Sequence, residues 1–409
     1  MGISYSRLRR NSSLERNEPS RIATTRTLRR LAFALSLTCS VWLIGCGGGG
    51  QGASGAGAGA GSQQIVDVSA TSMTLNGSPW LSKGVALQAF VRPLAVLQTD
   101  ASESARLNAR QNFGASELAA IRAFGADTIR FQIGQPALDP VSPLYDSTYL
   151  SQVVGAIQTA RQAGFVVMIM MQDEAISGDP HPHPLPTAET QTDWDLLAAQ
   201  FGSDRGVVFE LYNEPNLPDT STNWQLWLNG GTALNETTPS IGMQPLINHL
   251  RANGAQNVFV LDGLQLGKTL NGLPAVADPL NRLVYAVHPY QNGSANESQW
   301  DTQFGQASSR VPVWADEWSA PTGMSLGLGN LTSFDVAVDL LNYLRAHSIS
   351  LCTGAFDMPR FVVQDIPGWT LTNYDAISSG NSQTDGSGTL VHHDFAANYS
   401  RVLTQADGL

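Results

Sequence analysis

Two short segments about a hundred residues apart each end a hydrophobic, strand-like run with a glutamate. The first is LYNEP at 211–215, which contains Glu214, and the second is VWADEW at 313–318, which contains Glu317. Two carboxyl groups that different strands bring to one site can serve as a proton donor and a nucleophile, the pair that cleavage of a glycosidic bond requires. We therefore take Glu214 and Glu317 as the candidate catalytic residues.

Other polar residues stand at or near the carboxyl ends of predicted strands. They are Arg130, Gln172, Asn213, His288 and Tyr290. In an α/β barrel the carboxyl ends of all strands meet at the active-site mouth. We therefore expect these side chains to surround the two glutamates.

The elements that must position these residues follow a strand-then-helix rhythm without a repeat of fixed period. Eight apolar or β-branched runs are predicted as strands: 80–87, 128–132, 166–171, 207–212, 258–261, 283–287, 311–315 and 351–356. The clearest amphipathic helices are predicted at 116–124, 149–162, 192–201, 244–251 and 333–346. This alternation predicts an α/β protein with a parallel sheet, and the count of eight favours a single (β/α)8 TIM barrel over an open sheet. No glycine-rich phosphate fingerprint follows the early strands, which argues against a nucleotide site.

The barrel is expected to occupy residues 65–409, behind two segments of different character. Residues 1–46 resemble an export signal: a basic stretch, an apolar run too short to span a bilayer, and LIGC at 43–46. LIGC resembles the bacterial lipobox, in which the cysteine, here Cys46, becomes lipidated; a membrane anchor or an ordinary signal peptide with an incidental cysteine is the alternative. Residues 47–64 are almost all Gly, Ala, Ser and Gln and are predicted to form a flexible linker.

These features predict an exported protein, lipid-anchored to the bacterial cell envelope, or secreted if the lipobox is not used. The choice between Sec and twin-arginine export stays open. Of the three cysteines, Cys39 would leave with the signal and Cys46 would carry lipid, which leaves Cys352 alone. No intramolecular disulfide framework is then possible, so stability must come from the core.

The charge of the chain restricts its partners. The net charge is −11, and because residues 1–46 carry about +6, the remainder is near −17, with Lys83 and Lys268 as its only lysines. An acidic body repels nucleic acid and anionic lipid headgroups, so contact with a membrane is expected through the lipid anchor only. A neutral polysaccharide or oligosaccharide is the partner that this charge accommodates, and we expect a monomer.

The polar residues at the strand ends resemble those of glycoside hydrolase family 5, a family of retaining (β/α)8-barrel enzymes that includes cellulases and mannanases. The resemblance extends from about residue 75 to the C-terminus and rests on Arg130, Asn213-Glu214-Pro215, His288-Pro289-Tyr290 and Glu317. It implies that Glu214 is the acid/base and Glu317 the nucleophile of a double displacement. It implies no cofactor and no metal.

Charge and reach suggest roles for the supporting residues. Arg130 can hold Glu317 ionised, because guanidinium is always charged and offers a planar fork of donors. Asn213 can bond the sugar 2-hydroxyl, Tyr290 can donate to the nucleophile, and His288 can bond the sugar or steer the carboxylates.

Two positions depart from the family pattern. Gln172 stands where members usually have His, and it can bond a hydroxyl but cannot carry a proton. The usual Trp after strand eight is missing; Phe356 or Trp369 could replace it. Aromatic platforms for sugar rings are expected among Trp318, Trp224, Trp227, Trp300 and Trp369, with Trp318 and Trp369 the strongest candidates.

The HPHP segment at 181–184 invites a metal hypothesis. Its prolines impose an extended chain, and no third or fourth ligand stands at a recognised spacing, so a loop over the barrel mouth is the preferred interpretation.

Three functions remain open. The first is an endo-β-1,4-glucanase of the cellulase type. The second is a β-mannanase or exo-β-glycosidase of the same family. The third is a surface glycan-binding lipoprotein that has lost most or all turnover, which Gln172 and the missing Trp keep under consideration.

Overall fold

The computed structural model describes residues 64–291, 293–321, 333–374 and 385–409. The expected export signal with Cys46, and all but the last residue of the expected linker, lie outside the described residues. Within the described ranges, no helix has both the length and the apolar character that crossing a membrane would need.

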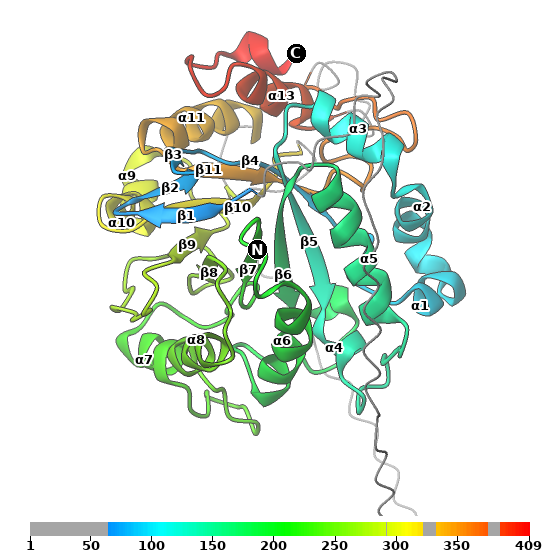
Figure 1. The fold of residues 1–409 in the computed structure, drawn as a ribbon. Coiled ribbons are helices and arrows are strands. Elements are labelled where there is room, and N and C mark those ends of the chain that lie inside the picture. Colours follow the sequence, from blue (N-terminus) through cyan, green and yellow to red (C-terminus); the bar gives the residue numbers. More distant parts are fainter. Residues whose placement is uncertain (1–63, 292, 322–332, 375–384) are drawn as a thin grey trace, which may run out of the picture. The chain divides into compact units, whose positions relative to one another are not determined.

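Eight parallel strands close into a barrel with the neighbour order β10-β11-β4-β5-β6-β7-β8-β9 (Figure 1). Each predicted strand run overlaps one of them, so the prediction of a (β/α)8 barrel is confirmed. The closure pairs β11 with β4 through Leu351–Lys83, Cys352–Gly84 and Thr353–Val85. The barrel strands are β4 (Lys83–Leu87), β5 (Thr128–Gly134), β6 (Val166–Gln172), β7 (Val207–Glu210), β8 (Phe259–Asp262), β9 (Leu283–Val287), β10 (Val313–Trp318) and β11 (Ser350–Thr353).

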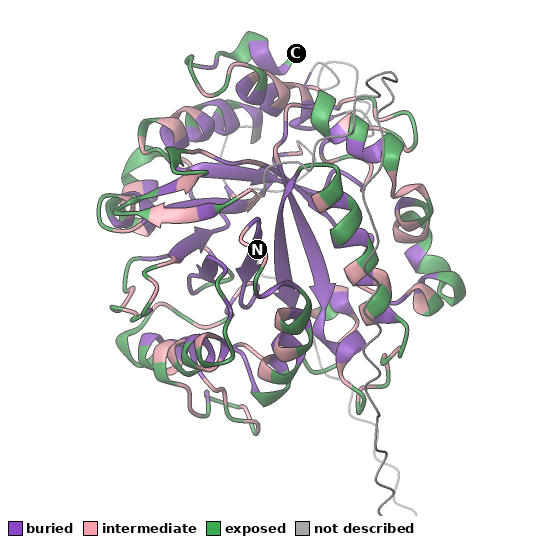
Figure 2. Ribbon diagram, in the orientation of Figure 1, coloured by how far each residue is buried: buried purple, intermediate pink, exposed green. Residues whose placement is uncertain are grey.

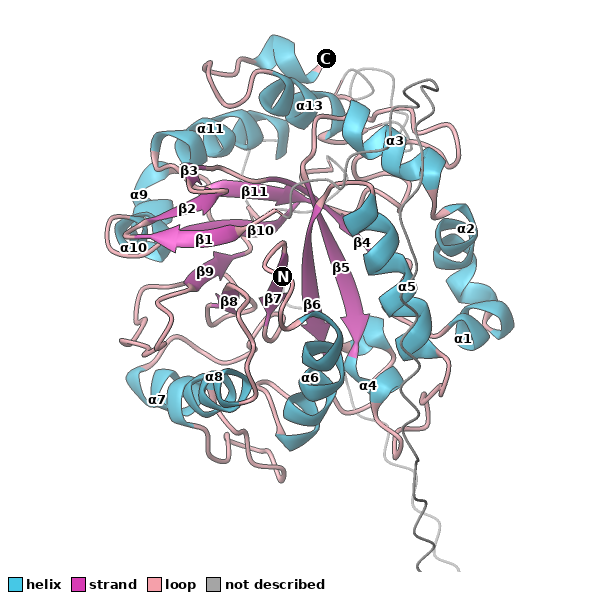
Figure 3. Cartoon of the chain, viewed as in Figure 1, coloured by secondary structure: helices cyan, strands magenta, loops and turns pink. Residues whose placement is uncertain are grey.

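Helices surround the barrel (Figure 3). They are α1 (Leu94–Thr99), α2 (Ser104–Asn112), α3 (Ala115–Ala123), α4 (Gln135–Leu138), α5 (Tyr149–Gln162), α6 (Ala188–Phe201), α7 (Ser221–Asn229), α8 (Met243–Ala252), α9 (Glu297–Trp300), α10 (Gln306–Ser308), α11 (Ser333–Ala346) and α13 (Gly388–Ala396). Four of the five predicted helices begin within one residue of the observed bounds. The fifth, α6, starts four residues before the predicted 192, because Thr187 and Thr190 form a reciprocal capping box.

The barrel strands are almost entirely buried (Figure 2), and the apolar core has two layers, one on each face of the barrel wall. The larger layer fills the space between the strands and the helices, and includes Ile129, Ile169 and Phe209. The smaller lies inside the barrel and includes Val208, Val260 and Trp314. Strands with apolar residues on both faces read as continuous hydrophobic runs, which is why the sequence revealed them.

A small antiparallel sheet precedes the barrel and was missed by the sequence analysis. Its strands are β1 (Val66–Ser69), β2 (Ser72–Leu75) and β3 (Ser78–Pro79). Val66 and Met73 pack with the inner core of the barrel. The strands have two to four residues, which is too short for an alternating hydrophobic pattern to be recognised.

Glu117 in the first turn of α3 gives a prediction about stability. Its side chain is buried, and burial, reinforced by Asp357, raises its pKa from 4.5 to about 9. A carboxyl whose pKa is raised on folding binds its proton more tightly in the folded state, so its contribution to stability falls as pH rises from about 4.5 to 9, by up to ~1.4 kcal/mol per pH unit. We expect Glu117→Gln to raise the thermal midpoint at pH 8 and to change it little at pH 4.5.

Glu189, in the first turn of α6, provides the control because it is exposed. Glu189→Gln should change the pH dependence of the thermal midpoint much less, through its minor effect on the pKa of Asp193. Equal effects of Glu117→Gln at both pH values would contradict a buried, protonated Glu117.

Candidate active site

The inner wall of the barrel changes from apolar to ionisable near the carboxyl ends of four neighbouring strands. Because side chains two residues apart share a face of a strand, the last inner-core residue of each of these strands is followed on the same face by an ionisable one. The pairs are Val208 and Glu210, Val260 and Asp262, Ala286 and His288, and Trp314 and Asp316. All four ionisable side chains are at most 1% exposed. This layer forms the floor beneath the two candidate catalytic glutamates.

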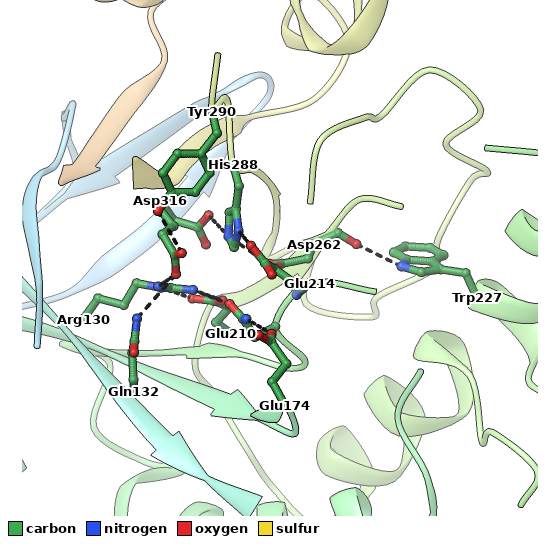
Figure 4. Close-up of polar contacts among 12 residues, drawn as sticks. Arg130, Gln132, Glu174, Glu210, Glu214, Trp227, Asp262, His288, Tyr290 and Asp316 are labelled. Carbon is green, nitrogen blue, oxygen red and sulfur yellow. Dashed lines mark hydrogen bonds and ion pairs between the residues drawn. The ribbon is translucent and has the colours of Figure 1, made fainter. Parts of the chain in front are cut away.

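Arg130 on β5 connects this floor to the rim and has no exposed surface (Figure 4). Its Nε and Nη2 donate to the two carboxylate oxygens of Glu210, at 2.6 and 2.5 Å. Its Nη1 donates to Glu317 Oε2 at 2.6 Å, and Nη2 also donates to Asn213 Oδ1 at 2.7 Å. The predicted contact of Arg130 with Glu317 is therefore present in the structure.

Glu317 reaches the site because β10 is irregular at its end. Trp314 and Asp316 face the barrel interior. Successive side chains of a regular strand point to opposite faces, so Glu317 would point away from the interior. The pairing of β10 with β11 shifts register between Ala315 and Trp318. Such an irregularity re-aims side chains, and it lets Glu317 point to the mouth beside the inward-facing Asp316.

The surroundings of Glu317 favour its ionised form. Burial acts to raise its pKa, but the charge of Arg130, followed by that of His288, outweighs burial and holds the pKa below 4.5. Tyr290 also donates its hydroxyl to Glu317 Oε1 at 3.0 Å. A carboxylate that is ionised at neutral pH is what nucleophilic attack requires.

Glu214 follows β7 and is held by two contacts. His288 Nδ1 lies 2.9 Å from Glu214 Oε1, and the Glu214 backbone N–H donates to Asp262 Oδ2 at 2.9 Å. The backbone of Glu214 is left-handed, with φ of 52°, a conformation uncommon for residues other than glycine. His288 is fully enclosed; burial acts to lower its pKa, but Glu317 and Asp262 hold the pKa well above 6.5.

The two candidate catalytic carboxylates lie close together. Oxygen atoms of Glu214 and Glu317 and a ring nitrogen of His288 all lie within 4.8 Å of one another. Retaining glycosidases place their carboxyl groups roughly 5 Å apart, whereas inverting enzymes leave about 6.5–9.5 Å for a water molecule. The separation suits direct attack by one carboxylate while the other transfers a proton.

Asn213 and Glu174 continue this network. The Asn213 side chain accepts from Arg130 and donates one hydrogen of Nδ2 to Glu174 Oε1. The second Nδ2 hydrogen is chemically available to a sugar hydroxyl. Burial, followed by the charge of Glu214, raises the pKa of Glu174 to about 7.

Two hollows flank Glu214, and Glu214 lines both. The first, of about 380 Å³, is also lined by Asp173, Glu174, His183, Asn213 and Leu234. The second, of about 420 Å³, is also lined by Gln265, Lys268, His288, Tyr290 and Phe361. His181 and His183 lie in the loop between β6 and α6, and His183 lines the first hollow, so the interpretation of HPHP as a loop at the barrel mouth is confirmed.

The expectations for the tryptophans were mostly wrong. Trp318 has no exposed surface and packs in the outer core, so it cannot offer a ring face to a sugar. Trp224, Trp227 and Trp300 are at most 2% exposed. The physical reason is that a large apolar ring near the mouth gains more from packing beneath the loops than from partial exposure.

Trp369 remains a candidate platform because it is only partly buried. Its ring stacks on Phe356, with centroids 5.7 Å apart and an interplanar angle of 18°. Phe356 itself is buried, so the two residues form one aromatic unit with Trp369 as its outer member. Gln172 ends β6 as predicted; it is 3% exposed, and its Oε1 has no hydrogen-bond partner among the described residues.

Several members of the site were not predicted from the sequence. Glu210, Asp262, Asp316 and Glu174 were not singled out. Glu210, Asp262 and Asp316 each lie two residues beyond an inward-facing apolar residue, and this period-two pattern was a signal that could have identified them. Glu174 carried no such signal, because it lies in a loop after β6.

The floor of the site has the donor types of a cation site. One donor atom from each of Glu210, Asp262, His288 and Asp316 lies within 4.8 Å of the others. Both oxygens of Glu210, however, already accept from Arg130. The expectation of a metal-free enzyme stays a prediction.

Comparison with known proteins gives a family match in the region that contains these residues. Residues 105–355 match the model of the cellulase family, glycosyl hydrolase family 5. The "Manganese dependent endoglucanase Eg5A" of Phanerodontia chrysosporium is 29% identical over 182 residues, which are 41% of this chain and 43% of that protein. "Endoglucanase gh5-1" of Neurospora crassa is 24% identical over 250 residues, 56% of this chain and 58% of that protein. The matched region thus spans about half the length of these relatives.

Solved structures show the same fold. A β-glucanase of Saccharophagus degradans in complex with cellotetraose aligns with a TM-score of 0.60 at 16% identity, over 82% of this chain and 94% of that one. A hyperthermophilic endocellulase of Pyrococcus horikoshii aligns with a TM-score of 0.57 at 16% identity, over 79% and 99%. The family match covers more than half of the chain and contains Arg130, Glu214, His288 and Glu317. The chain therefore belongs to the cellulase family, glycosyl hydrolase family 5.

Proposed function

We propose that this protein is an endo-β-1,4-glucanase of the cellulase type that retains anomeric configuration. The observation that carries the proposal is the placement of Glu214 and Glu317 oxygens within 4.8 Å of each other, with only Glu317 bound to Arg130. The pair is close enough for a covalent intermediate and unequal in its electrostatic surroundings. The endoglucanase names of its relatives support the same substrate class.

The mechanism has two steps. In the first, Glu317 attacks the anomeric carbon, the bond to the leaving oxygen breaks, and Glu214 gives its proton to that oxygen. In the second, Glu214 takes a proton from water, whose oxygen attacks the anomeric carbon and releases Glu317. Arg130 and Tyr290 stabilise the Glu317 carboxylate before attack and after its release.

The shape of the mouth supports cleavage within a chain. Glu214 lines hollows on two sides, of about 380 and 420 Å³. A polysaccharide that crosses Glu214 can place sugar units in both. An enzyme that removes single terminal sugars needs only one closed pocket beside its carboxylates.

A substrate panel tests this proposal. The protein should release a ladder of cello-oligosaccharides from soluble β-1,4-glucan and lower its viscosity early, with slower action on mannan and xylan. Product sizes over time and the anomeric configuration of the first product are the measurements. Repeating the assay after dialysis against EDTA, with and without added Mn²⁺, should give unchanged rates, because no step above uses a metal.

Other results would redirect the proposal. Preferential cleavage of mannan would assign a β-mannanase, and release of single sugars alone would assign an exo-glycosidase. Binding of a glucan without cleavage would leave a glycan-binding role. If EDTA abolished the activity and Mn²⁺ restored it, the enzyme would need a metal, and the mechanism proposed here would be incomplete.

A further inference from the structure

We propose that Asp262 is a positioning residue that holds the acid/base Glu214 from both its backbone and its side chain. This inference rests on the proposed function. Asp262 is the last residue of β8 and has no exposed surface. It therefore cannot touch substrate, and any effect on the reaction must pass through other residues.

The first hold is on the backbone of Glu214. Asp262 Oδ2 accepts the Glu214 N–H at 2.9 Å, and Glu214 is left-handed with φ of 52°. A non-glycine residue keeps this conformation only where its surroundings impose it. Asp262 Oδ2 is buried and placed to accept this N–H, so Asp262 is suited to impose it.

The second hold is on the side chain of Glu214, through His288. His288 Nδ1 lies 2.9 Å from Glu214 Oε1, while its Nε2 lies 3.4 Å from Asp262 Oδ2 and 3.3 Å from Asp316 Oδ1 (Figure 4). The Nε2 distances are longer than ordinary hydrogen bonds, but both aspartates lie on the Nε2 side of the ring, across from Glu214. The two aspartates thus orient the imidazole so that Nδ1 points at Glu214.

Asp262 is itself fixed. Its backbone carbonyl accepts from Trp227 Nε1 at 2.9 Å, and the residue pairs with Ala286 in the barrel. Trp227 is fully buried in α7. The barrel wall and α7 therefore fix the position of the Glu214 carboxylate, which does not depend on its own loop alone.

The test compares two substrates with different need for an acid. A 2,4-dinitrophenyl β-cellobioside has a leaving group that departs without a proton, whereas cellotetraose requires one. Displacement of a catalytic group by about 1 Å can cost about 10²-fold. For Asp262→Ala we expect kcat/KM on cellotetraose to fall about 10²-fold. For the dinitrophenyl substrate, kcat/KM, which reports formation of the intermediate, should fall by less than about tenfold.

Asp262→Asn keeps an oxygen at the position of Oδ2, which faces both the Glu214 N–H and His288 Nε2, and removes only the ability to ionise. The kcat/KM of Asp262→Asn on cellotetraose should lie between those of the wild type and Asp262→Ala. This variant should show the same preference for the activated substrate. It also decides the question if Asp262→Ala does not fold. Asp127→Asn is the matched control: Asp127 accepts the backbone N–H of Lys83 at 3.0 Å just before β5, at the opposite end of the barrel, and should leave the ratio unchanged.

Equal losses on both substrates in the Asp262 variants, or no loss on either, would overturn the inference. Its failure is distinguishable from failure of the proposed function by Glu214→Ala. If that variant loses cellotetraose cleavage but keeps the activated substrate, the proposed function stands whatever Asp262 does. If Glu214→Ala shows no such preference, the proposed role of Glu214 fails first.

Discussion

Glu317→Ala should abolish hydrolysis of β-glucan, with kcat reduced by roughly 10⁴-fold or more. The change removes the only carboxylate of the site that combines a contact to Arg130 with a donated hydroxyl from Tyr290 among the described residues. Added azide should restore turnover of an activated aryl β-cellobioside, because the small anion can occupy the space of the lost carboxylate and attack the anomeric carbon. The product should be the glycosyl azide of inverted configuration, measured by proton NMR.

The matched control is Glu297→Ala, which truncates an exposed glutamate in the first turn of α9. It should keep the wild-type rate and show no response to azide. Full activity of Glu317→Ala would remove the proposed mechanism. An azide product of retained configuration would instead assign Glu317 as the acid/base.

Arg130→Met should give the largest loss of stability of any single change in the site. The two side chains have similar length, but the change leaves Glu210 buried without its bidentate partner and Glu317 without its counter-charge. Removing one member of a buried ion pair costs about 3–5 kcal/mol, and for a domain of this size that lowers the thermal midpoint by roughly 4–7 °C. Activity should be lost as well, since the pKa of Glu317 rises when Arg130 is absent.

A double variant separates the two effects. Adding Glu210→Gln to Arg130→Met removes the unpaired buried charge, so part of the stability should return while activity stays absent. The loss in Arg130→Met should be smaller at low pH, where the two carboxyls can be protonated, and larger at high pH. Arg205→Met, which removes a partly exposed pair with Asp67, should cost about 1 kcal/mol or less. Equal losses in the two arginine variants would show that Arg130 has no special place in the barrel.

The sequence predicted the barrel because its strands carry apolar residues on both faces. All eight runs overlap barrel strands, and α5 and α11 begin and end at the predicted residues. The short sheet of β1 to β3 was missed, because its strands are too brief for their period to be recognised. The hydrophobic pattern of a long strand can be recognised from its own residues. Whether a very short strand forms depends on the residues against which it packs.

Residue type and position at or near predicted strand ends were sufficient to name Asn213, Glu214, His288, Tyr290 and Glu317, and also Arg130, although the structure places Arg130 in the middle of β5 rather than at its end. The contacts of Arg130 and Tyr290 with Glu317 are present as expected. The expectation for Trp318 was wrong because this side chain is fully buried, and the type of an aromatic residue does not indicate whether it is exposed or buried. Exposure depends on neighbouring loops and helices, which single positions do not encode.

The sequence by itself determined the fold class, the two catalytic candidates and the arginine that holds one of them, because these follow from periodicity and chemical type. Only the tertiary structure decided that Glu210, Asp262 and Asp316 form a buried ionisable floor beneath them, and that an irregularity in β10 turns Asp316 and Glu317 to the same site. It also decided that Asp262 contacts the backbone of Glu214. These contacts join residues 48 to 106 positions apart, and their geometry arises only when the barrel closes.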